Sequence, residues 1–163
     1  MSTQQAGEKA IMTIPGEREI HVERVFAAPR ERVFAVYIDP ELIPHWWGPR
    51  GTSTRVEELD ATPGGAWRFV VTDSDGSEIV FRGVFREVVV PERIVQTFEW
   101  DGMPGYVSVD SVSFVDLGNR TRVISDSIFF TAEERDGMLE SGMEGGMNET
   151  YDRLDELLAG QAS

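Results

Sequence analysis

The chain has 163 residues, the length of one domain and enough to bury a sizeable apolar core without cross-links. Its net charge is −14, so its surface repels the phosphates of nucleic acids and the anionic headgroups of lipids. The absence of cysteine excludes disulfides, thiolate catalysis and cysteine-ligated zinc. These totals predict a cytoplasmic domain that binds neither nucleic acid nor a membrane.

Residues 1–17 are predicted to be a flexible leader that precedes a single domain at 18–160. The only apolar piece of this leader is 11–14, and no basic region comes before it, so a signal peptide is not expected. No apolar run in the chain approaches the roughly 20 residues that a membrane-spanning helix needs.

The first regular elements are expected to be a strand and two short helices. Polar and apolar residues alternate over 18–26, which is typical of a half-buried strand. Pro29 predicts the first position of a helix that runs to about Asp39, because a proline there loses no hydrogen bond. A second short helix, with Asp39 as its N-cap, is expected to carry Trp46 and Trp47.

A pattern of period two extends from 52 to 130 and is interrupted by turns, which predicts about six antiparallel strands in a meander. Pro91 marks one strand boundary, because proline donates no ladder hydrogen bond. The other boundaries are clusters of the residues that favour tight turns. These clusters lie at 62–65, 73–76, 101–105 and 117–119.

Two helices are expected after the strands. Thr131 and Ser141 each stand three residues before a glutamate, which is the pattern of a capping box at a helix N-terminus. The second helix should run to about Ala159, with one apolar face. That face comprises Met143, Met147, Tyr151, Leu154 and Leu158. A long sheet followed by an amphipathic helix predicts an α+β fold in which a curved antiparallel sheet wraps around the C-terminal helix.

Five motifs, in this order along the chain, resemble a known family. They are 24–29 (RVFAAP), 46–49 (WWGP), 64–67 (GGAW), 83–95 (GVFREVVVPERIV) and 142–146 (GMEGG). Together they are similar to helix-grip domains related to the C-terminal domain of the activator of the ninety-kilodalton heat-shock protein ATPase. These domains belong to the START and birch-pollen-allergen (SRPBCC) superfamily, and the match covers about 18–158.

The resemblance implies a helix-grip fold with a hydrophobic cavity between the sheet and the last helix. Members of the superfamily use this cavity for lipids, sterols, polyketides and other apolar molecules, and a few cyclise or hydrolyse them. The chain departs from the family where Met147 replaces a tryptophan that commonly follows the glycines of the last helix. The eukaryotic activator also has a separate N-terminal domain, which a 17-residue leader does not supply, so the co-chaperone role is not expected to carry over.

Twelve residues are predicted to line this cavity. They are Trp46, Trp47, Trp67, Phe69, Phe81, Phe85, Phe98, Trp100, Tyr106, Met143, Met147 and Tyr151. Trp46 and Trp47 point in different directions because they are sequence neighbours, so both are buried only where protein or ligand lies on two sides. With Met143 and Met147 they are predicted to form a wall where substitutions change ligand range more than folding. Ordinary core packing remains the alternative for each aromatic residue.

Gly145 and Gly146 lie in the first turns of the last predicted helix, where a glycine costs about 1 kcal/mol relative to alanine. A glycine at such a position indicates that the backbone approaches something closely. The sequence leaves two alternatives open: the helix approaches the sheet, or it approaches a ligand.

Catalytic machinery is sparse, and no catalytic residue, metal ligand or cofactor motif is assigned. His45, beside the tryptophans at the expected cavity mouth, is a weak candidate for a general base. Charged residues of the strands could also supply a buried polar anchor if they face inward. The alternation of polar and apolar residues does not show which way they face. These residues are Arg68, Arg82, Asp110 and Asp126.

We therefore predict a protein that binds a small apolar molecule between the sheet and the C-terminal helix, without a cofactor. One alternative is an enzyme of the cyclase or hydrolase type acting on an apolar substrate. The other is a chaperone-linked interaction module, whose partner is a chaperone or a second copy of the chain.

Overall fold

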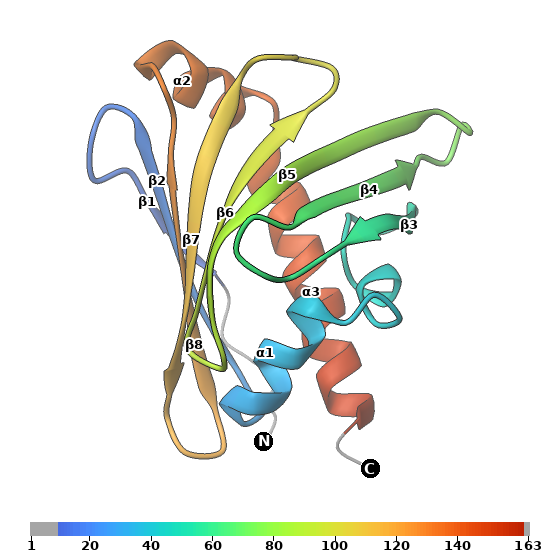
Figure 1. Cartoon of the computed structure of the whole chain (residues 1–163), viewed down its shortest axis with the longest axis vertical. Helices are drawn as coiled ribbons and strands as arrows, with labels where there is room; N and C mark the ends of the chain where they lie inside the picture. Colours follow the sequence, from blue (N-terminus) through green and yellow to red (C-terminus); the bar gives the residue numbers. More distant parts are fainter. Residues whose placement is uncertain (1–9, 162–163) are drawn as a thin grey trace.

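The computed structural model of the chain describes residues 10–161. Eight strands form one antiparallel sheet in the order β1-β2-β8-β7-β6-β5-β4-β3, and the sheet curves around the C-terminal helix (Figure 1). The strands are β1 (Ile11–Thr13), β2 (Glu19–Phe26), β3 (Ser53–Leu59), β4 (Ala66–Thr72), β5 (Glu78–Val89), β6 (Arg93–Trp100), β7 (Val107–Asp116) and β8 (Thr121–Ile128). The helices are α1 (Arg30–Ile38), the 3₁₀ helix η2 (Ile43–His45), α2 (Ala132–Glu140) and α3 (Met143–Gln161). The predicted α+β helix-grip fold is confirmed.

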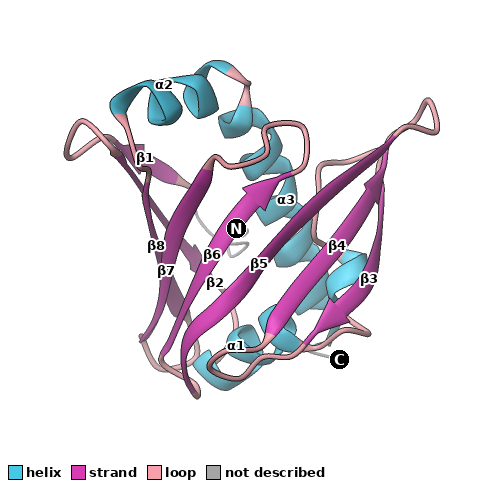
Figure 2. Ribbon diagram, turned by 45° about the horizontal axis from the view of Figure 1, so that its top comes forward, coloured by secondary structure: helices cyan, strands magenta, loops and turns pink. Residues whose placement is uncertain are grey.

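The six strands predicted between 52 and 130 are β3 to β8, and they form the predicted meander. Each expected turn joins two neighbouring strands. The four glycine-containing turns each place a glycine at φ of 88–90°, a conformation that other residues adopt only with strain. Register shifts at Val56/Glu58 and Phe85/Glu87 interrupt β3 and β5, and bulges of this kind increase the bend of a sheet. Figure 2 shows the resulting curvature.

The N-terminal segment contains a strand that the sequence analysis missed. Ile11–Thr13 form β1 and pair with His21–Glu23 of β2, at one edge of the sheet. Three residues are too few for a hydrophobic period to be recognised, which is why this strand gave no signal. Residues 1–9 of the expected leader lie outside the described part of the chain.

One of the two predicted capping boxes is wrong. At the start of α2 the Thr131 hydroxyl accepts a hydrogen bond from the Glu134 backbone N–H (3.1 Å), as predicted. Ser141, in contrast, ends α2, and its hydroxyl donates to the Met138 carbonyl oxygen (2.6 Å). Gly142 then takes a left-handed φ of +84°, which stops a helix, so α3 begins one residue later at Met143.

Two smaller boundary predictions also shift. Pro29 is the N-cap of α1 and not its first residue. Asp39 follows the end of α1, and its carboxylate accepts from the Glu41 N–H (2.9 Å), whereas η2 starts later, at Ile43. The short helix is therefore capped by Leu42, without a side-chain hydrogen bond.

The main core fills the end of the concave face that α1 covers (Figure 1), and it continues into Trp67, Phe69 and Phe85 of β4 and β5. Phe34 of α1 and Phe114 of β7 pack edge to face with ring centroids 5.0 Å apart. Leu154 and Leu158 of α3 complete this end, and neither is more than 1% exposed. A smaller cluster of Ile20, Val22 and Phe129 lies under α2 residues at the other end.

Two arginines fix α3 against the rest of the domain. Arg24 of β2 is almost fully buried and pairs with Asp152 (2.9 Å) and Asp155 (3.6 Å) of the helix. Arg153 of α3 donates to the carbonyl oxygens of Gly48 (2.8 Å) and His45 (3.1 Å). The helix is thereby tied both to the sheet and to the segment that carries the paired tryptophans. None of the helices in residues 10–161 is long and apolar enough to cross a bilayer.

Candidate ligand-binding site

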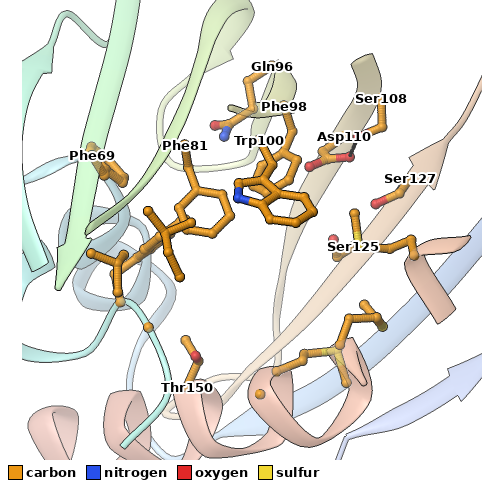
Figure 3. Close-up of a pocket in the computed structure, with 18 of the residues that line it drawn as sticks. Phe69, Phe81, Gln96, Phe98, Trp100, Ser108, Asp110, Ser125, Ser127 and Thr150 are labelled. Carbon is orange, nitrogen blue, oxygen red and sulfur yellow. Dashed lines mark hydrogen bonds between the residues drawn. The ribbon is translucent and has the colours of Figure 1, made fainter. Parts of the chain in front are cut away.

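A cavity of about 680 Å³ lies between the concave face of the sheet and α3 (Figure 3). All twelve residues predicted from the sequence are in its lining. The structure thus brings together side chains from the η2 segment, from β4 to β6 and from α3. Whether these residues contact a ligand stays a prediction.

An aromatic wall, formed by Trp47, Trp67, Phe69, Phe81 and Phe98, belongs to the cavity lining. Figure 3 shows three of these rings, Phe69, Phe81 and Phe98. Trp47 lies edge-on to Phe69 and Phe81, with ring centroids 5.1 and 5.2 Å apart. Phe81 and Phe98 are 5.5 Å apart. Rings held by several neighbours in edge and tilted contacts have little freedom to move, so this wall has a fixed shape.

The two adjacent tryptophans have different environments. Trp46 is only 3% exposed, its indole N–H donates to the Val36 carbonyl oxygen (3.1 Å), and its ring packs on Tyr37. Trp47 is half-buried, and its ring belongs to the aromatic wall. Trp46 therefore serves the core as well as the cavity, and we expect its substitution to disturb folding, contrary to the expectation from sequence.

Gly145 and Gly146 do not approach the sheet. A Cβ atom placed on either would meet no atom within 4 Å. Gly146 is part of the cavity lining, between Met143 and Met147. The first alternative, close packing of these glycines against the sheet, is therefore wrong. The open space beside Gly146 is part of the cavity.

A polar row lies beside the aromatic residues of β6, on the same concave face of the sheet (Figure 3). Asp110 of β7 is directly opposite Gln96 of β6 and Ser127 of β8, and all three line the cavity. The Ser108 hydroxyl donates to Asp110 Oδ1 (3.1 Å, dashed in Figure 3). Burial raises the pKa of Asp110 to about 6, although hydrogen bonds from Ser127 and Ser108 act in the opposite direction.

Only one of the four charged residues considered as an anchor faces the cavity. Asp110 does so, whereas Arg68 pairs with Glu57 (2.8 Å) and Arg82 with Glu99 (3.5 Å), away from it. Asp126 accepts from His21 (2.5 Å) and is likewise outside the lining. The inward Asp/Arg pair is therefore not formed.

His45 is exposed and does not belong to the cavity lining, so it is not where the sequence placed it as a candidate general base. Its backbone carbonyl is used instead, as an acceptor for Arg153. The mouth of the cavity is bordered by Arg50 and by Met103 and Tyr106 of the β6–β7 loop.

Two tyrosines lie at the base of the cavity. Burial raises the pKa of Tyr37 well above its usual value and that of Tyr151 to about 12. The negative charge of Asp110 also raises the pKa of Tyr151, so the two groups are near each other. Both hydroxyls therefore remain neutral and can donate or accept a hydrogen bond.

Other polar residues of the lining were not predicted from the sequence. They include Gln96, Ser108, Ser125, Ser127 and Thr150. The β7 residues could have been found from Phe114. If Phe114 is buried, its face of the strand points inward, and Ser108 and Asp110 lie on the same face because side chains alternate. Within residues 10–161, no group of three or more His, Asp or Glu side chains could hold a metal ion.

A curved, unclosed antiparallel sheet that grips a C-terminal helix over a mostly apolar cavity defines an SRPBCC-type domain, a fold that houses ligand-binding and polyketide-cyclase-like proteins. The family model described as activator of Hsp90 ATPase homolog 1-like protein matches residues 27–159, and the chain belongs to this family. A search of functionally curated proteins found no match.

Solved structures share the fold. A Rhodobacter sphaeroides protein is 24% identical, with a TM-score of 0.88, and the match covers 94% of this chain and 99% of that one. An Arthrobacter aurescens protein is 27% identical, with a TM-score of 0.85 and 91% of each chain covered. The AHSA1 protein of Silicibacter pomeroyi is 25% identical, with a TM-score of 0.72 and coverage of 88% and 99%.

Proposed function

We propose that the domain binds a small, predominantly apolar molecule in the cavity between the sheet and α3. The observation that carries this proposal is the cavity itself, whose volume of about 680 Å³ is within the range of roughly 300–1,000 Å³ for small-molecule sites. Its lining combines an aromatic wall with a small number of polar groups, which is the usual composition of such sites. The absence of cysteine supports action in a reducing compartment such as the cytoplasm.

The cavity wall combines a fixed side with an adaptable side. The aromatic wall is held by ring-to-ring contacts, as described above. Met143 and Met147 of α3 lie across from it, and methionine side chains adjust readily to the shape of a neighbouring surface. We therefore expect a ligand class with a common flat or ring-shaped body and variable substituents.

An enzyme of the cyclase or hydrolase type is the second candidate, and Asp110 is the observation that favours it. A carboxyl group whose pKa is about 6 exchanges protons readily near neutral pH. Turnover of a bound compound that Asp110→Asn abolishes, while binding persists, would support the enzyme over the binding protein.

The test is a panel of fatty acids, sterols, aromatic amines and aromatic polyketides, read by tryptophan fluorescence and thermal shift. All four tryptophans line the cavity, so an occupant should change their emission. Native mass spectrometry of the purified protein would show a molecule that was retained from the cell. If no compound changes emission or melting temperature, the binding proposal is contradicted, and an interaction module that contacts a chaperone or a second copy is favoured.

A further inference from the structure

The charged groups that line the cavity are mostly of one sign. Among the described residues, they are the carboxylates of Asp73, Asp110 and Glu134 and the guanidinium of Arg50. Arg50 lies at the mouth and is already paired with Glu156 (2.5 Å). Asp73 is exposed as well, so the charged groups inside the cavity are the carboxylates of Asp110 and Glu134, and both are negative, as is the chain as a whole.

Asp110 has neutral polar neighbours on every strand beside it. Ser108 and Ser127 donate hydrogen bonds, and Gln96 stands directly opposite on β6. Within residues 10–161, burial and the two serines are the influences on its pKa, and no arginine is among them. Arg24, the buried arginine of β2, is paired with Asp152 and Asp155 of α3 instead.

Such a carboxyl group is ionised near neutral pH, because its pKa of about 6 lies below that pH. A carboxylate that faces an enclosed cavity without a counter-ion is unfavourable, and a cation that pairs with it relieves this. The rings of Trp100, Phe98 and Phe81 share the cavity with Asp110 (Figure 3), and aromatic faces also attract cations. A carboxylate ligand would instead meet charge of its own sign.

We propose that the molecule bound in this cavity carries a protonated amine that pairs with Asp110, while its apolar body lies against the aromatic wall. The inference rests on the proposed function and narrows it to hydrophobic amines. Fatty acids and other apolar carboxylates are correspondingly rejected.

The experiment uses three compounds that share a naphthalene ring and differ in one group: naphthylethylamine, naphthylethanol and naphthylacetate. Calorimetric titration of the full chain at about pH 7.5 should give an amine affinity at least about tenfold above that of the alcohol, since a charge-assisted hydrogen bond is roughly twice as strong as a neutral one. The acid should bind most weakly. Equal binding of all three contradicts the amine inference and leaves cavity binding intact, whereas no binding of any contradicts the proposed function itself.

A variant assigns the preference to Asp110. Asp110→Asn keeps the size of the side chain and removes its charge, so it should reduce amine affinity to that of the alcohol and leave alcohol affinity within about threefold. Retained alcohol binding also shows that the variant is folded. Glu31→Gln is the matched control, because it removes one exposed negative charge from α1, away from the cavity lining, and should change none of the three affinities. An amine preference that survives Asp110→Asn overturns the inference.

A measurement on the unmodified chain covers the case in which Asp110→Asn does not fold. Amine affinity should fall about tenfold between pH 7.5 and pH 5, as Asp110 becomes protonated, while alcohol affinity stays constant. The other titratable groups of the lining near Asp110 are Glu134 of α2, Tyr37 of α1 and Tyr151 of α3. The neighbouring strands β6 and β8 present Gln96 and Ser127, which do not titrate. Glu134→Gln should keep the pH dependence, and its loss in that variant contradicts the assignment to Asp110.

Discussion

The two halves of α3 face the same sheet and do different work. Leu154 and Leu158, in the C-terminal half, are at most 1% exposed and are enclosed by α1 and the sheet. Met143, Gly146 and Met147, in the N-terminal half, face a cavity. One helix thus supplies the core at one end of the domain and the wall of a site at the other.

The strands opposite the helix show the same division. Along the inward face of β7, Ser108 and Asp110 border the cavity, and Phe114 is buried in the core four residues further on. The β8 strand repeats this gradient from Ser127 and Ser125 to the buried Val123. On these elements the packed residues lie at one end and the cavity-lining residues at the other, and we expect the packed end to contribute more of the stability.

The largest expected effect is a difference between two substitutions on α3. Leu154→Ala should lower the free energy of unfolding by about 2–5 kcal/mol, because it leaves a void in a packed core. Met143→Ala should cost less than about 1 kcal/mol, since its side chain already borders open space. Urea unfolding of both variants measures the difference. Equal losses would mean that the hollow end is packed like the core.

The next effect concerns Asp110, whose folded pKa of about 6 lies above its ordinary value of 3.8. A group with a raised folded pKa contributes stability that is fully present below the unfolded pKa and is lost as the pH rises through the folded one. Asp110→Asn should therefore stabilise the free protein by about 1–3 kcal/mol at pH 7.5, with no gain below about pH 4. Unfolding curves of the variant and the parent across this pH range check the sign. If the variant is less stable than the parent at pH 7.5, the Asp110 carboxylate is not an enclosed charge without a counter-ion.

A smaller gain is expected at Gly146. Gly146→Ala should stabilise the domain by about 1 kcal/mol, because alanine favours the helix and a Cβ there meets no atom within 4 Å. Gly142→Ala is the matched control in the same segment, and it should destabilise, because Gly142 has a φ of +84°. Thermal unfolding of the pair decides the matter. Loss of stability in Gly146→Ala would show that this backbone is closely packed after all.

The smallest effect lies outside the cavity, at His21. Its ring bridges Glu23 (2.7 Å) and Asp126 (2.5 Å), and these hydrogen bonds, from Glu23 first, raise the pKa of His21. The bridge should therefore contribute stability that is fully present below about pH 6.5 and is lost as the pH rises through the raised pKa of His21. Because the cluster lies at the surface, this contribution should be a few tenths of a kcal/mol. The difference in unfolding free energy between the parent and His21→Gln, followed with pH, measures it. A difference that grows as the pH rises would contradict the assignment.

The sequence predicted the meander, the gripping helix and the aromatic lining because these depend on local patterns. Turn clusters are short-range, and the apolar stripe of α3 repeats every three or four residues. The polar row was not predicted because both faces of β7 and β8 carry apolar residues, so alternation alone did not show that Asp110 faces inward and Asp126 outward. Ser141 was misread because a hydroxyl three residues before a glutamate occurs at both ends of a helix. In the structure, the left-handed conformation of Gly142 places Ser141 at the end of α2. This conformation depends on the surrounding fold.

Filling the space beside Gly146 tests whether this space is a binding cavity. Gly146→Leu places an apolar side chain into that space without a clash at Cβ. Calorimetric titration with the neutral naphthylethanol, which does not depend on the charge of Asp110, compares this variant with the parent. The variant should melt at or above the parent's temperature and should no longer bind naphthylethanol. A stable variant that binds naphthylethanol as tightly as the parent would contradict a binding cavity in this space.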